Sequence, residues 1–78
     1  MIPAEAFPPG EFIRDELEAR GWEQRDLAAI TGLPEHVVSE IVSGARAITL
    51  ETAQRLGEAF STGARFWTNM ESAYRRGT

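Results

Sequence analysis

Apolar side chains recur at helical spacing in five short stretches of this 78-residue sequence, and no stretch alternates apolar and polar residues as a half-buried strand does. The stretches cover residues 11–20, 24–31, 33–43, 50–60 and 64–76. Short connections join them, which is typical of helices that pack beside their neighbours in the chain. We therefore predict an all-α fold, in which five helices share one core.

The predicted helices each need an apolar face to pack in that core. In the first helix we place Phe12, Ile13 and Leu17 on one side, and in the second we expect Leu27, Ala28 and Ile30 to be buried. The third presents Val38, Ile41 and Val42, and Thr49 is expected to cap the fourth. Three of the four prolines lie in residues 1–10, which predicts an extended arm before a single domain over residues 11–78.

Length and composition limit the function. A chain of 78 residues holds one domain and is too small for a large enzyme with a deep cleft. It has no cysteine, so neither a disulfide framework nor a thiolate site is expected. The segment Met1–Glu5 lacks the basic start and apolar run of a signal peptide, and every long apolar stretch is interrupted. We expect a cytoplasmic protein that is not an enzyme, needs no cofactor or metal and does not bind a membrane.

Charge is unevenly distributed along the chain. The formal net charge is −4, and all eight cations are arginine. Residues 1–43 hold nine acids and three arginines, a balance of −6, whereas residues 44–78 hold three acids and five arginines, a balance of +2. Nucleic-acid binders are usually basic. Any surface that contacts DNA must therefore be assembled locally from a few arginines and backbone amides.

Residues 24–43 have the spacing of a helix-turn-helix unit. Gly32 stands where the chain must turn, and Ala28, four residues earlier, has a side chain small enough for two helices to approach closely. Val38 and Ile41, six and nine residues after Gly32, are placed to reach the core beneath the second helix. In such a unit the second helix enters the major groove of DNA.

These residues resemble the Xre (Cro/repressor-like) family of helix-turn-helix regulators. The segments Pro9–Phe12, Ala47–Ala53 and Arg65–Trp67 narrow the resemblance to HigA-type antitoxins, and the match covers about residues 8–74. The resemblance implies a five-helix domain that forms a homodimer and binds double-stranded operator DNA near its own promoter. It also implies a toxin partner, typically a basic ribonuclease, towards which an acidic chain would be steered by charge.

The resemblance also assigns residues to contacts with DNA. It implies base reading by Glu35, His36, Ser39, Glu40 and Ser43. It implies phosphate contacts by Gln24, Arg25, Arg46 and Thr49. The reading face departs from the family pattern, because Glu35 and Glu40 stand where arginine, lysine, glutamine or asparagine is common. Glutamate accepts a hydrogen bond from cytosine but is repelled by phosphate, so few counterions would be released on binding.

Some residues support other interpretations. His36 and Glu40 share a helical face, but two ligands make a poor metal site and an exposed ion pair is expected instead. Glu35, His36 and Ser39 cannot adopt triad geometry from one helix. Trp22 is expected at the core edge. An aromatic band on the last helix either caps the core or forms a dimer or partner interface: Phe66, Trp67, Met70 and Tyr74.

Two rival functions remain at this stage. The chain is either a regulator, as above, or a protein-interaction module that keeps the fold and reads no DNA, using its acidic first helix (Glu11, Asp15, Glu18) or its last aromatics. A further alternative is the amino-terminal domain of a longer regulator with a metallopeptidase beyond Thr78. The sequence has one histidine and no HExxH motif, so peptidase chemistry is not expected within it.

Overall fold

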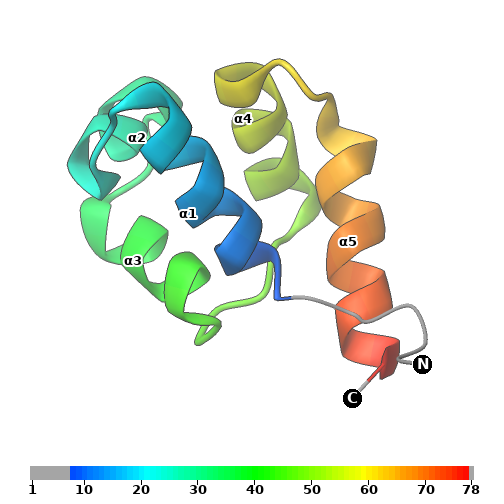
Figure 1. The fold of residues 1–78 in the computed structure, drawn as a ribbon. Coiled ribbons are helices and arrows are strands. Elements are labelled where there is room, and N and C mark those ends of the chain that lie inside the picture. Colours follow the sequence, from blue (N-terminus) through cyan, green and yellow to red (C-terminus); the bar gives the residue numbers. More distant parts are fainter. Residues whose placement is uncertain (1–7, 78) are drawn as a thin grey trace.

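The computed structural model describes residues 8–77, with side chains described through Arg75. Within this range the chain forms five helices and no strand: α1 (Pro9–Arg20), α2 (Gln24–Thr31), α3 (Glu35–Ser43), α4 (Leu50–Phe60) and α5 (Ala64–Gly77). In Figure 1, α1 crosses the middle of the view, with α2 and α3 to one side of it and α5 to the other. The predicted all-α fold is confirmed.

One apolar core joins the helices. α1 packs against α3 and α5, and α4 packs against α2 and α5. The core side chains come from all five helices and from the link before α4: Ile13, Leu17, Leu27, Ala28, Val38, Ile41, Val42, Ile48, Ala53, Leu56, Phe60 and Trp67. Trp22 packs at the edge of this core, as expected, and stacks on Phe60 with 6.0 Å between ring centroids.

Two predictions of burial were wrong. Ile30 is 50% exposed, and Thr31 is buried in its place. At about 100° per residue, Leu27, Ala28 and Thr31 share one narrow arc of α2, and Ile30 lies about 100° from the centre of that arc. The buried Thr31 hydroxyl is satisfied because it donates to the Leu27 carbonyl at 2.7 Å. Phe12 is 39% exposed, while its predicted partners in the core are buried.

The start of α1 also differs from the prediction. The helix begins at Pro9, so residues 9 and 10 of the predicted arm are helical, and residues 1–7 lie outside the described part of the chain. Proline fits the first turn of a helix because its missing N–H would have no partner there. Gly10 is buried, and a Cβ at this position would clash with the backbone carbonyl of Val42. α1 therefore packs on the end of α3 through its bare backbone.

Candidate nucleic-acid interface

The turn between α2 and α3 is fixed by backbone and side-chain hydrogen bonds. Gly32 has a φ of 78°, in the left-handed region that favours glycine, and its N–H donates to the Ala28 carbonyl at 2.8 Å. The Leu33 N–H donates to the Thr31 hydroxyl at 3.3 Å. From α4, the Arg55 guanidinium donates to the Thr31 carbonyl at 2.7 Å. These contacts set the direction in which α3 leaves the turn.

α3 has a buried face and an open face. Val38, Ile41 and Val42 are each 5% exposed or less. On the other side of the helix, four of the predicted base-reading residues are exposed: Glu35, His36, Ser39 and Ser43. Glu40, the fifth, is half-buried. The predicted readers thus share the outward face of α3. This helix lies at the edge of the fold (Figure 1).

The predicted phosphate-binding residues lie at the start of α2, in the link that follows α3 and at the cap of α4. Gln24 opens α2 and is half-buried, whereas Arg25 is exposed and its Nε lies 2.9 Å from Glu23 Oε1. Arg46 follows α3, and its Nη2 lies 2.7 Å from Glu40 Oε1. Thr49 caps α4 as predicted, its hydroxyl accepting the Thr52 N–H at 3.3 Å. Both arginines assigned to phosphate are therefore already paired with a carboxylate of the same chain.

The helix-turn-helix family model matches residues 13–67, which contain the whole of this surface. The chain belongs to the helix-turn-helix family. The expected resemblance to Xre-type regulators and HigA-type antitoxins is confirmed by this match and by the solved structures that share the fold.

Three similar proteins illustrate the relationship of this helix-turn-helix chain. It is 39% identical over 70 residues to Virulence-associated protein I of Dichelobacter nodosus, spanning 88% of this chain and 65% of that protein. An addiction module antidote protein of the HigA family from Coxiella burnetii shares the fold with a TM-score of 0.87 and 35% identity, covering 94% of this chain and 80% of its own.

The third is a Pseudomonas aeruginosa protein, solved in complex with its 18-bp operator DNA. It matches with a TM-score of 0.87 and 36% identity, over 99% of this chain and 81% of that one. With identities of 35% and 36%, both solved structures are similar in sequence as well as in fold.

The expected ion pair between His36 and Glu40 is not formed. Glu40 instead pairs with Arg46, because the loop after this helix-turn-helix unit brings the guanidinium back over the last turn of α3. Within the residues that the structure describes, no group of three or more histidine, cysteine, aspartate or glutamate side chains is arranged to hold a metal ion. Arg55 Nη2 lies 3.3 Å from Glu51 Oε2, an ion pair within α4.

The aromatic band of α5 divides into a core residue and a surface. Trp67 is fully buried, and its indole N–H donates to the Thr62 hydroxyl at 2.7 Å, so it is a core residue and has no surface to offer a partner. Phe66 is 40% exposed and meets Phe12 edge to face, with 5.7 Å between centroids. Met70 and Tyr74 are half-buried. Phe66, Met70 and Tyr74 remain as interface candidates.

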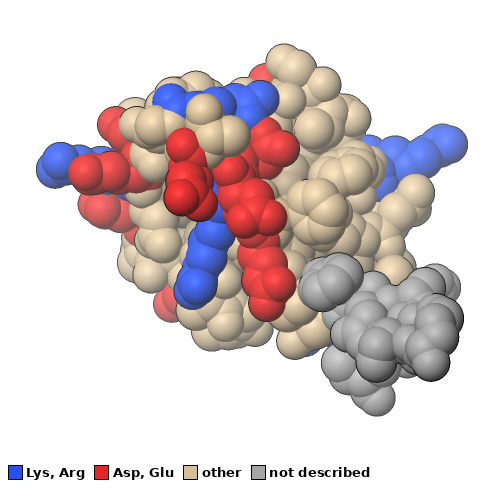
Figure 2. All heavy atoms as spheres, in the orientation of Figure 1, with Lys and Arg blue, Asp and Glu red and all other residues tan. Residues whose placement is uncertain are grey.

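Acidic side chains gather on a second surface of this helix-turn-helix protein. Figure 2 shows them over α1, on the face turned towards the viewer. The exposed acids of α1 include Glu11, Asp15 and Glu18. None of the helices in the described part of the chain is long and apolar enough to cross a lipid bilayer.

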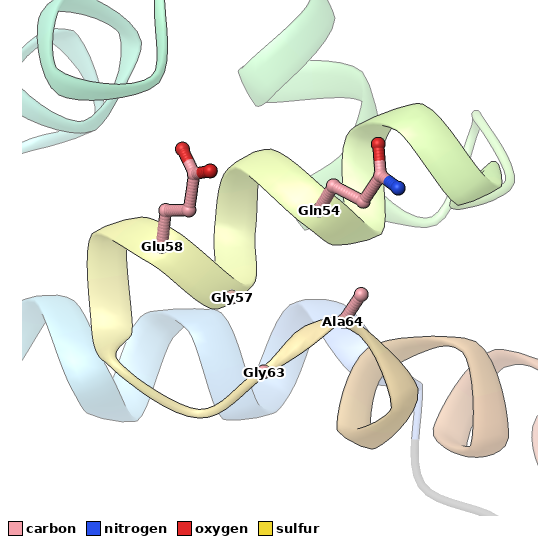
Figure 3. Close-up of a pocket in the computed structure, with 5 residues that line it drawn as sticks. All are labelled: Gln54, Gly57, Glu58, Gly63 and Ala64. Atoms are coloured by element: carbon pink, nitrogen blue, oxygen red, sulfur yellow. The ribbon is translucent and has the colours of Figure 1, made fainter.

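A hollow of about 430 Å³ lies where α4 meets the start of α5. Figure 3 shows Gln54 and Glu58 projecting from α4 beside it, while Gly57 and Gly63 contribute only backbone. A Cβ on Gly57 would lie 2.5 Å from the carbonyl carbon of Gly63, so glycine permits this close approach. The hollow lies away from α3 and plays no part in the candidate interface.

Sequence reasoning missed two contacts of the site. Glu40 was assigned to bases, and its contact with Arg46 depends on how the 44–49 link folds. The hydrogen bond from Arg55 to the Thr31 carbonyl, across the α2–α4 contact, was not predicted. The i,i+4 spacing to Glu51 was the available signal, and it does not reveal a partner 24 residues away.

Proposed function

We propose that this chain is a DNA-binding transcriptional regulator of the HigA-like antitoxin type, which binds the operator of its own gene. The observation that carries the proposal is the outward face of α3, whose direction is set by the hydrogen-bonded turn at Gly32. The similarity to a protein whose structure contains operator DNA supports it. Such a regulator acts in the cytoplasm, where its operator lies, and works by binding rather than by catalysis.

In this proposal α3 lies in the major groove. Glu35, His36, Ser39 and Ser43 face the base edges, and Glu40 joins them where Arg46 releases it. The Gln24 end of α2 supplies amide groups to one phosphate, as helix amino termini do. Arg25, Arg46 and Thr49 are assigned to neighbouring phosphates and set the register of the protein on the duplex.

A gel shift with labelled duplex from the gene's own upstream region tests this proposal. We expect retardation at low salt, and weaker binding by Arg46→Ala and Gln24→Ala. Arg65→Ala is the matched control, because it removes the same charge from α5, which does not pack on α3. If neither Arg46→Ala nor Gln24→Ala weakens binding, the surface assigned to DNA contacts is wrong. Equal binding of the upstream duplex and a scrambled duplex would show that the protein does not recognise an operator sequence.

We further propose a basic toxin, such as a ribonuclease, as the second partner. The acidic surface over α1 in Figure 2 supports this, because complementary charge raises association rates. Co-expression with a small basic protein encoded beside this gene tests the idea. We expect the two proteins to purify together, and triple reversal of Glu11, Asp15 and Glu18 to lysine to separate them while DNA binding persists. Co-purification that survives the reversal would place the partner elsewhere.

The homodimer of the proposal is assigned to the exposed part of α5. Phe66, Met70 and Tyr74 supply the apolar contact, and Phe12 extends it from α1. An interaction module without DNA binding is the second candidate, favoured by the same acidic surface. It would replace the regulator if the upstream duplex is not bound while the basic partner is.

A further inference from the structure

The carboxylate of Glu40 binds the guanidinium of Arg46, which the proposed function assigns to a DNA phosphate. Both Nε and Nη2 of Arg46 lie 2.7 Å from the same oxygen, Oε1 of Glu40. The two side chains are 46% and 42% exposed, so the pair sits at the surface and solvent or DNA can reach it. A guanidinium binds carboxylate and phosphate oxygens through the same N–H groups. The two anions therefore compete for one site.

The backbone after α3 brings Glu40 and Arg46 together. Gly44 has a φ of 89°, a left-handed conformation that turns the chain back over the last turn of α3. The N–H groups of Ala45 and Arg46 donate to the Glu40 carbonyl at 2.9 and 3.2 Å, and the Ser43 hydroxyl donates to it at 3.1 Å. The residue that carries the guanidinium is thus tied to the residue that carries the carboxylate, and only side-chain rotation separates the two charged groups.

The other assigned cation shows the same arrangement. Arg25 Nε lies 2.9 Å from Glu23 Oε1, with both side chains more than 60% exposed. The remaining residues assigned to phosphate, Gln24 and Thr49, are uncharged. Each formal positive charge of the assigned phosphate contacts is therefore matched by an adjacent carboxylate.

We propose that Glu40 is an internal competitor for the DNA phosphate and sets the affinity of the α3 surface. The inference rests on the proposed function. On binding, Arg46 exchanges the carboxylate for a phosphate, so that the protein gains only the difference between two similar contacts. The released carboxylate then lies near DNA and retains cations, which reduces the net release of counterions. Low affinity for arbitrary duplex follows, because that binding is almost wholly electrostatic.

The test is a double-mutant cycle between Glu40→Gln and Arg46→Ala, measured by fluorescence anisotropy on the upstream duplex and on a scrambled duplex. We expect Glu40→Gln to tighten binding to both by about two- to five-fold, the range for loss of an exposed ion pair. The slope of log K against log salt should steepen by up to about 0.9. Arg46→Ala should weaken binding more in the Glu40→Gln background than in the wild type.

Glu35→Gln is the matched control, since it removes the same charge from the same helix. Glu35 takes part in none of the ion pairs among the described residues, so its substitution should leave the effect of Arg46→Ala on binding unchanged. Thermal melting of each variant checks that the fold persists. If Arg46→Ala costs less after Glu40→Gln, Arg46 serves to neutralise Glu40 and the inference is wrong. If neither the wild type nor Glu40→Gln binds either duplex, the proposed function itself fails.

Discussion

Arg55 on α4 donates a hydrogen bond to the backbone carbonyl of Thr31, the last residue of α2, over 2.7 Å. This carbonyl lies at the carboxyl end of a helix, where no intrahelical donor reaches it. The contact therefore joins the helix-turn-helix turn to a helix that does not itself touch α3 closely. The direction of α3 depends on a side chain outside the helix-turn-helix unit.

Replacing Arg55 with alanine should destabilise the fold and weaken DNA binding without removing a DNA contact. Loss of a hydrogen bond from a charged donor to a partly buried carbonyl costs about 1.5–3 kcal/mol. Each kcal/mol lowers the melting temperature of a domain of this size by about 4–8 °C. Glu51→Ala is the control, because it breaks the ion pair of Arg55 and leaves the Thr31 contact in place. Equal effects of the two substitutions in thermal melting would refute the assignment.

Gly10→Ala should destabilise the protein, although within a helix alanine is normally more favourable than glycine by about 1 kcal/mol. The added Cβ would clash with the Val42 carbonyl, and backbone cannot move aside as a flexible side chain can. Overpacking of this kind costs about 1–3 kcal/mol. Urea denaturation measures the sign of the change. Glu11→Ala, at the exposed neighbouring position, should change stability by less than about 0.5 kcal/mol. A more stable Gly10→Ala protein would contradict the observed contact of α1 with α3.

Thr49→Ala should cost about 1 kcal/mol, because the hydroxyl that accepts the Thr52 N–H at the start of α4 is lost. Thr49→Ser retains the acceptor and should restore most of the stability. The comparison of the two in chemical denaturation isolates the cap. If Thr49→Ser is as unstable as Thr49→Ala, the methyl group rather than the hydroxyl matters at this position.

Phe66→Glu should shift the protein towards monomer in sedimentation equilibrium. The side chain is 40% exposed in the single chain, so a charge is tolerated there before association but not within an apolar interface. Leu50→Glu is the control, since Leu50 is 63% exposed at the start of α4 and outside the proposed interface. A dimer that resists Phe66→Glu and dissociates with Leu50→Glu would move the interface to α4.

The sequence predicted the fold well because helix periodicity and glycine stops are local signals. α2 and α4 have the predicted bounds, and the core positions of α3 are buried as expected. The wrong predictions concern the burial of side chains, which depends on tertiary packing. Ile30 and Thr31 both lie next to Leu27 on the helix, and only the position of the neighbouring helices decides which is covered.

The candidate site was less predictable than the fold. Positions on the outward face of α3 follow from the helical repeat, so their exposure was foreseeable, but their roles on DNA stay predictions. The pairing of Arg46 depends on a left-handed residue at Gly44 and on the path of the loop. Trp67 could not be assigned to core or surface from sequence, because both environments favour an aromatic residue.

The bare contact between Gly10 and Val42 has a consequence for how two ligands would influence each other. α1 carries the acidic surface, and its first turn rests directly on the backbone at the end of α3. A protein that tilts α1 must therefore displace the carboxyl end of α3 as well, because no side chain lies between them to absorb the movement. Thermodynamic linkage then requires duplex bound along α3 to alter the affinity of that protein by an equal factor.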